Sequence, residues 1–271
     1  MSDKPHIRPP AVAGMFYPAE ANILARDIHA CLAAAPRAGI PVPKALIVPH
    51  AGYVYSGAVA ASAYKLLAPA HATIRRVVLL GPAHRVPVLG LVLPVAEAFA
   101  TPLGVVRVDA EAAAAALKLP QVSASDAAHG MEHALEVQLP FLQSVLDDFT
   151  IVPFVVGAAK PAEVAAVIDL LWGGPETLIL ISSDLSHFHS YTAAQAIDRS
   201  TVKDMLALEP LTNHEQACGA TPINGLLRCA QRRGMQIALL DMCNSGDTAG
   251  DRSRVVGYAS LALTEVENAH A

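Results

Sequence analysis

Three histidines each follow a short apolar segment in this sequence, and an imidazole can bind a metal ion or transfer a proton. The apolar segments at 45–49, 76–80 and 177–181 have the composition of buried strands, and His50, His84 and His187 lie in the loops after them. Ligands of open parallel sheets bind just beyond the carboxyl ends of the strands. We therefore expect these three imidazoles to meet at one edge of a sheet.

Two imidazoles need a further ligand to hold a metal, and Asp247, in the Gly-rich polar loop 244–251, is the predicted one. Two histidines and a carboxylate are typical of Fe(II) sites, and the same set can hold Zn(II) with an activated water. Asp247 has an alternative role as an Asx-turn or helix-cap residue. Cys243 is the alternative ligand, and its sulfur would favour copper or Zn(II).

His187 ends the segment SSDLSH (182–187), which is rich in hydrogen-bonding groups and follows a very apolar segment. An imidazole there is suited to accept a proton from a bound phenol, enol or water, with Asp184 or a serine positioning it. A Ser-His-Asp triad is a weaker alternative because the sequence has no Gly-x-Ser-x-Gly turn. We predict that His187 is the catalytic base.

Glu132 and His133 lie in a segment that reads as a helix over residues 132–146, with Glu132 and Glu136 on one face. The His-x-x-Glu-His spacing of residues 129–133 also occurs in an inverted zinc-protease motif, but nothing downstream supplies a recognisable third ligand for it. We therefore predict that Glu132 and His133 support the metal ligands or face the substrate. The alternative is that they are surface residues of a helix.

Apolar segments that alternate with Ala-rich helical ones predict a single α/β domain over residues 1–271, with a central mixed, mostly parallel sheet flanked by helices. Further strands are expected at 88–92, 104–108, 151–156, 236–240 and 255–263. Helices are expected at 19–35, 58–67, 110–117, 132–146, 161–171, 193–208 and 222–233.

Composition limits the classes of function. The net charge of -5 gives no basic excess for nucleic acid, and no segment has the roughly 18 apolar residues of a membrane span. The four cysteines include no Cys-x-x-Cys pair, so they predict neither a disulfide framework nor a structural zinc site. With no secretory signal visible, a cytoplasmic protein is expected.

Several segments together resemble the Memo family, whose bacterial and archaeal members include AmmeMemoRadiSam system protein B. The matching segments span almost the whole chain: RPPAVAGMFYP (8–18), PHAGY (49–53), GPAH (81–84), EHALEVQLPF (132–141), SSDLSH (182–187), CGATPI (218–223) and NSGD (244–247). The resemblance implies a fold similar to that of class III extradiol dioxygenases, in which two histidines and a carboxylate hold iron and another histidine is the base.

By this resemblance His50 and His84 are metal ligands and His187 is the base. Animal members have a cysteine near the third-ligand position, which falls at Asp247 or Thr248 here, so Asp247 remains the candidate. Tyr53, Asp184 and Cys218 lie within the matching segments and are expected to support the ligands or contact the substrate. The family name also implies radical SAM and AMMECR-type proteins as partners.

Three functions remain open at this stage. The first is a non-haem iron oxidoreductase, dioxygenase-like, that acts on a small and for example phenolic substrate, with Fe(II) preferred over Zn(II) or copper. The second is a metal-binding or redox-sensing interaction protein without turnover, because a fold and its ligands can persist while the chemistry changes. The third is a zinc-dependent hydrolase, and a ligand-free binding module for peptides is a weaker alternative.

Overall fold

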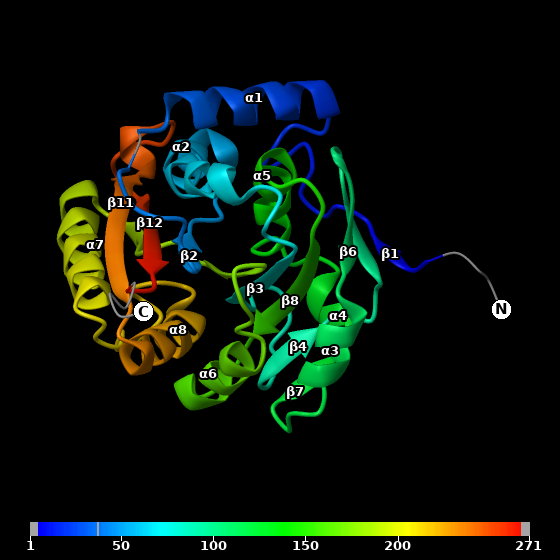
Figure 1. Cartoon of the computed structure of the whole chain (residues 1–271). Coiled ribbons are helices and arrows are strands. Elements are labelled where there is room, and N and C mark those ends of the chain that lie inside the picture. Colours follow the sequence, from blue (N-terminus) through cyan, green and yellow to red (C-terminus); the bar gives the residue numbers. More distant parts are fainter. Residues whose placement is uncertain (1–4, 37, 267–271) are drawn as a thin grey trace.

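A twelve-stranded mixed sheet forms the centre of the computed structural model, which describes residues 5–36 and 38–266 (Figure 1). The expected domain, 1–271, also includes residues 1–4, 37 and 267–271, which lie outside the described part. The strands are β1 (Ile7–Arg8), β2 (Ala45–Val48), β3 (Arg76–Pro82), β4 (Leu91–Leu93), β5 (Ala98–Thr101), β6 (Gly104–Val108), β7 (Val122–Ala124), β8 (Thr150–Val156), β9 (Thr177–Ser182), β10 (His187–His189), β11 (Gln236–Asn244) and β12 (Val255–Thr264).

The main path through the sheet runs β1-β5-β6-β8-β3-β9-β2-β12-β10, with β11 paired to β12, and β4 joining β7 to β8. Its centre is parallel, since β3 pairs with both β8 and β9, and β9 pairs with β2. Antiparallel pairs flank this centre on both sides, at β2 with β12 and at β5 with β6. The predicted α/β fold with a mixed central sheet is confirmed, and β2, β9 and β3 are neighbours as expected.

Helices cover both faces of the sheet (Figure 1). They are α1 (Ala21–Ala34), α2 (Tyr53–Tyr64), α3 (Ala110–Ala116), α4 (Asp126–His129), α5 (Leu139–Val145), α6 (Pro161–Leu170), α7 (Tyr191–Leu206) and α8 (Ala220–Arg233), with 3-10 turns η1 (Lys65–Ala70), η2 (Glu136–Gln138) and η3 (Ser245–Asp247). Side chains alternate along each strand, so Leu46 of β2 packs under α1, α2 and α5, whereas Ile47 packs toward α3, α6, α7 and α8. Both faces of the central strands are therefore buried.

The segment predicted as a helix over 132–146 is helical only in its later part. Residues 130–135 form a loop, η2 follows, and α5 begins only at Leu139, with Pro140 in its first turn. Proline is favoured in a first helical turn because its missing N–H has no partner there. Glu136 is fully buried, and its carboxylate accepts hydrogen bonds from Arg8 and from the Tyr17 hydroxyl. Glu136 therefore anchors the N-terminal segment and does not share a helical face with Glu132.

No helix in residues 5–36 and 38–266 is long and apolar enough to cross a membrane.

His129, at the end of α4, is a buried imidazole outside the predicted site. It is 1% exposed, its Nε2 donates to the Val92 carbonyl at 2.8 Å, and its Nδ1 has no partner within the described part of the chain. Burial lowers the pKa of His129 from 6.5 to about 4. The unfolded chain takes up this proton at a higher pH than the folded chain does, so acid favours unfolding between these two pKa values.

We expect this histidine to lower the free energy of unfolding by about 2 kcal/mol between about pH 7 and pH 5. His129→Gln keeps a donor for the Val92 carbonyl and removes the titration, so urea unfolding of this variant should depend less steeply on pH. A variant with the same pH dependence as the unmodified protein would refute this account.

Candidate metal centre

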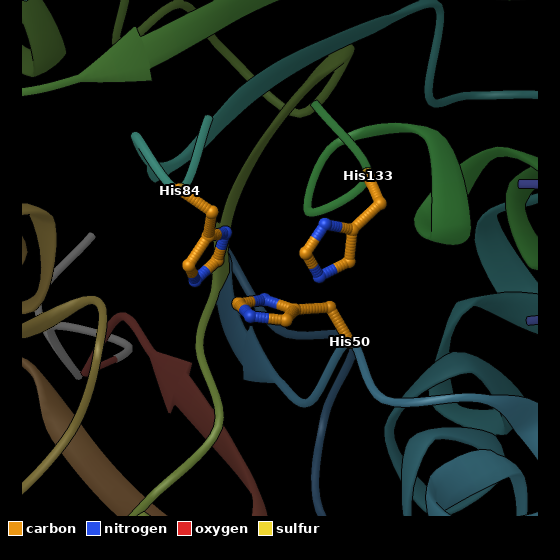
Figure 2. Close-up of side chains that lie close together, drawn as sticks. All are labelled: His50, His84 and His133. Carbon is orange, nitrogen blue, oxygen red and sulfur yellow. The ribbon is translucent and has the colours of Figure 1, made fainter. Parts of the chain in front are cut away.

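Three histidines from three separate loops turn their rings toward one another (Figure 2). His50 follows β2, His84 follows β3, and His133 lies in the loop before η2. One ring nitrogen of each residue lies within 4.8 Å of the nitrogens of the other two. The ring centroids are 4.8 to 5.5 Å apart. This cluster has the donors and the compactness to hold a single metal ion.

The tautomer of His50 is set by Ser182, the last residue of β9. The Ser182 hydroxyl donates to the Ala134 carbonyl at 2.7 Å and accepts from the Gln138 side-chain amide at 2.7 Å. His50 Nδ1, 2.8 Å from the same hydroxyl, must therefore be the donor to it. The lone pair of His50 is consequently on Nε2, which is the nitrogen free for a metal.

Glu132 sets the orientation of His84 and fixes the backbone around His133. One carboxylate oxygen accepts the backbone N–H of His84 at 2.6 Å, and the other lies 3.0 Å from His84 Nδ1. The second oxygen also accepts the backbone N–H groups of His133 and Ala134, both at 2.9 Å. Since a carboxylate only accepts, His84 carries its proton on Nδ1 and keeps Nε2 free. Glu132 therefore orients His84 and the His133 backbone from a loop, and not from a helix.

The loop that carries His133 lies close over the end of β3 because Gly81 leaves room for it. A Cβ on Gly81 would come within 2.9 Å of the Leu135 side chain and 3.2 Å of the Ala134 Cβ. A side chain at position 81 would therefore crowd Ala134 and Leu135, the two residues that follow His133. The Tyr53 hydroxyl fixes η2, which follows this loop, since it donates to the Val137 carbonyl at 2.7 Å.

The electrostatics of the cluster favour the neutral form of His50 and His133, which is the form that binds metals. Burial, together with the neighbouring His84, lowers the pKa of His50 to about 3. Burial and His50 lower the pKa of His133 to about 4. Although burial opposes its ionisation, Glu132 has a pKa lowered to about 2, since it accepts hydrogen bonds from His84 and from backbone N–H groups. The site therefore combines two imidazoles held in the neutral form, His50 and His133, with a charged carboxylate beside them.

Two clefts border the cluster, and His187 lines both. The larger, of about 730 Å³, is also lined by His84 and Cys218 and has an apolar wall that includes Phe188. The smaller, of about 360 Å³, is also lined by His133 and Asp184. Phe188 has a left-handed φ of 62°, and the pairing of β10 with β12 is irregular between His187 and His189. Such irregularities in a strand often re-aim a side chain beside an active site.

Asp247 is not brought to the three imidazoles. It is exposed on η3, where its carboxylate accepts the Asn244 backbone N–H at 3.1 Å and the Tyr191 hydroxyl at 2.5 Å. Asn244 caps the same turn reciprocally, so Asp247 has the turn-capping role that was the alternative. Cys243 lies beside it and lines a different, small cavity against α7. We therefore replace Asp247 with His133 in the candidate ligand set.

Asp184 and Cys218 both contact His50. An Asp184 carboxylate oxygen accepts the His50 backbone N–H at 2.7 Å, and the other lies 4.0 Å from His50 Nε2. Burial raises the pKa of Asp184 above its usual range. The Cys218 sulfur lies 3.4 Å from His50 Nε2, and burial, with the nearby Asp184, raises the pKa of its thiol to about 12. Both residues thus lie beside the cluster, in contact with His50.

Glu132→Gln is expected to weaken metal binding about 10- to 100-fold. The amide would place N–H donors against the backbone N–H groups that the carboxylate now accepts, and the His84 ring would lose its fixed tautomer. Titration with Zn(II), followed by calorimetry, measures the change. Gln143→Glu, a control at a position outside the site, should leave the affinity unchanged. Unaltered affinity in Glu132→Gln would mean that this carboxylate does not orient the ligands.

Comparisons with known proteins agree with the resemblance found in the sequence. The family model described as Memo-like protein matches residues 8–262. A MEMO1 family protein of Ignicoccus hospitalis is 38% identical, and one of Aquifex aeolicus is 37% identical. A third, from Methanosarcina barkeri, is 34% identical. These alignments cover 94% of this chain and 98 to 99% of the relatives.

Proposed function

The chain belongs to the Memo family, and we propose that it is a metal-dependent oxidoreductase whose ion is held by His50, His84 and His133. The observation that carries the proposal is the approach of these three imidazoles to within 4.8 Å at the carboxyl edge of the sheet. Hydrogen bonds from Nδ1 leave the Nε2 lone pairs of His50 and His84 free, as in metal sites whose ligands are oriented by a second layer of residues. The donor set therefore fits a transition metal.

We propose Fe(II) as the ion and a small, for example phenolic, molecule as the substrate. Iron supplies redox chemistry with dioxygen, which side chains lack. The cleft of about 730 Å³ beside His84 is large enough for such a molecule, and its wall of Phe188, Val88 and Val156 suits an aromatic ring. His187 borders the same cleft, so its imidazole is suited to accept the proton of a substrate hydroxyl.

A second candidate function is hydrolysis with Zn(II). It is favoured by the third donor, since three imidazoles with no carboxylate are a ligand set of catalytic zinc sites. In that case His187 would accept a proton from a water molecule instead of from a substrate hydroxyl. The expected radical SAM and AMMECR-type partners stay a prediction.

Anaerobic purification with metal analysis, followed by two assays, tests the proposal. We expect one ion per chain, and oxygen uptake with at least one member of a catechol panel by the iron-loaded protein. His84→Ala is the metal-free control, and Asp247→Ala is a control with an intact cluster. Ester hydrolysis by the zinc-loaded protein without oxygen uptake would support the second candidate. Metal binding with neither activity would point to a metal-binding or redox-sensing protein without turnover.

A further inference from the structure

Arg254 is the one arginine or lysine among the described residues that line the two clefts beside the metal centre. It lines the smaller cleft, of about 360 Å³, together with His133 and His187. We infer that Arg254 binds a carboxylate of the substrate, which is therefore a hydroxylated aromatic acid. This inference rests on the proposed function, and it names the substrate class of the same site.

The Arg254 guanidinium has no carboxylate partner within the described part of the chain, where the arginine ion pairs all involve other arginines. Its central carbon lies 5.0 Å from the centroid of the Phe188 ring, within the range of a cation–π contact. A guanidinium over an aromatic face keeps the N–H groups at its edge free to donate. Arg254 can therefore donate two parallel hydrogen bonds to a carboxylate.

The strand β12 brings this guanidinium to the cleft. Arg254 immediately precedes β12, and Val256 and Tyr258 of the strand line the same cleft. Successive side chains of a strand alternate between its faces, so these three side chains share one face. β12 pairs with β10 at Val256 and His187, which keeps this face beside the proposed base. A substrate hydroxyl at His187 and a substrate carboxylate at Arg254 can therefore belong to one small molecule.

The loop before β12 forms a compact turn in the wall of this cleft. The Gly250 N–H donates to the Ser245 carbonyl at 2.7 Å, and a Cβ on Gly250 would lie only 2.9 Å from that oxygen. The Ser245 hydroxyl accepts the Val256 N–H at 3.1 Å. Ser245 and Gly250 both line the cleft. These contacts hold the start of β12, and Arg254 with it, beside the cleft.

The other walls of the smaller cleft suit an aromatic ligand with a single negative charge. Three aromatic side chains line it, those of Phe16, Tyr55 and Tyr258. Asp184 is the one carboxylate of the lining, and it already accepts the His50 backbone N–H at 2.7 Å. One guanidinium balances one negative charge, and a second charge on the ligand would lie near Asp184 without a cation to offset it. A carboxylate therefore fits this cleft better than a doubly charged phosphate does.

Calorimetric binding of two matched probes to the zinc-loaded full chain tests this inference without any dependence on iron turnover. The probe 3,4-dihydroxybenzoate carries the carboxylate, and 3,4-dihydroxybenzamide has a similar shape without the charge. We expect the unmodified protein to bind the benzoate about 10-fold or more tightly than the amide, because a hydrogen bond between charged groups is stronger than one to a neutral amide. Arg254→Gln should abolish this preference by weakening the benzoate alone, and its unchanged affinity for the amide would show that the variant is folded. Arg252→Gln, the matched control, should keep the preference, since the Arg252 guanidinium lies over Tyr191 and lines neither cleft.

The outcomes separate the role of Arg254 from the proposed function. Equal affinities of the unmodified protein for the two probes would overturn the role of Arg254 and leave the metal site intact. A preference that survives in Arg254→Gln, or a variant that loses both probes alike, would overturn it as well. Loss of the preference in Arg252→Gln would show that the net charge of the loop, and not Arg254, attracts the anion. Binding of neither probe to the zinc-loaded protein would refute the proposed substrate site together with this inference.

Discussion

Replacing His133 with glutamine is expected to lower the affinity for Fe(II) or Zn(II) by about 100-fold or more, because a three-imidazole set loses one of its donors. Glutamine is similar in size, so the loop should keep its place over Gly81. Asp247→Ala should bind the metal as the unmodified protein does, since Asp247 caps η3 and lies outside the cluster. Metal content after anaerobic dialysis measures the occupancy of each variant, and calorimetric titration measures its affinity for the metal.

This pair of variants decides between the two possible third ligands. If Asp247→Ala loses the metal and His133→Gln retains it, then the loop 244–251 moves to the site in the loaded protein and the carboxylate is the ligand. Circular dichroism and thermal unfolding of both variants without metal show whether either substitution has altered the fold. If both variants bind the metal with unchanged affinity, then the third ligand beside His50 and His84 is neither Asp247 nor His133.

The sheet edge that carries the site could be predicted because its signals are local. The segments 45–49, 76–80 and 177–181 are short, apolar and followed by loops, and each is a strand in the parallel centre. Parallel strands end at the same edge, so the segments that follow them and contain His50, His84 and His187 are expected to be neighbours, although His187 begins the short strand β10 instead of lying in a loop. In the structure His50 and His84 belong to one cluster, and His187 lines a cleft together with His84.

His133 could not be assigned as a ligand because its position depends on contacts between distant segments. The sequence of 132–146 has helical periodicity, yet Glu132 instead accepts backbone N–H groups from its own loop and from His84, 48 residues away. The loop fits against β3 because Gly81 has no side chain. The sequence around His133 contains no sign of this contact. The His-x-x-Glu-His spacing of residues 129–133 is the one local signal for His133, and its meaning depends on whether the segment is a helix or, as here, a loop.

Asp247 shows the opposite case, in which a local interaction prevailed over a long-range one. Asn244 and Asp247 are three residues apart and cap one another, a role that the sequence NSGD supports as well as it supports ligation. The Tyr191 hydroxyl then adds a further hydrogen bond from α7. A carboxylate whose oxygens both accept hydrogen bonds at a turn is held there, so the imidazole of His133 takes its place beside His50 and His84.

The second large effect is expected at His187, whose replacement by alanine should retain the metal and lose turnover by about 10²-fold or more. His187 lines both clefts beside the cluster without belonging to the three-imidazole set, so its loss removes a proton acceptor and leaves every proposed ligand in place. His189→Ala is the matched control, because His189 lies on the same short strand, opposite Val255. Oxygen uptake with a catechol that the unmodified protein consumes measures turnover, and metal analysis of the same samples measures occupancy.

If His187→Ala loses its metal, His187 is a ligand and the assignment of His133 must be revised. If metal and turnover are both unchanged, another group accepts the proton, and Asp184, buried between His50 and the smaller cleft, becomes the residue to test.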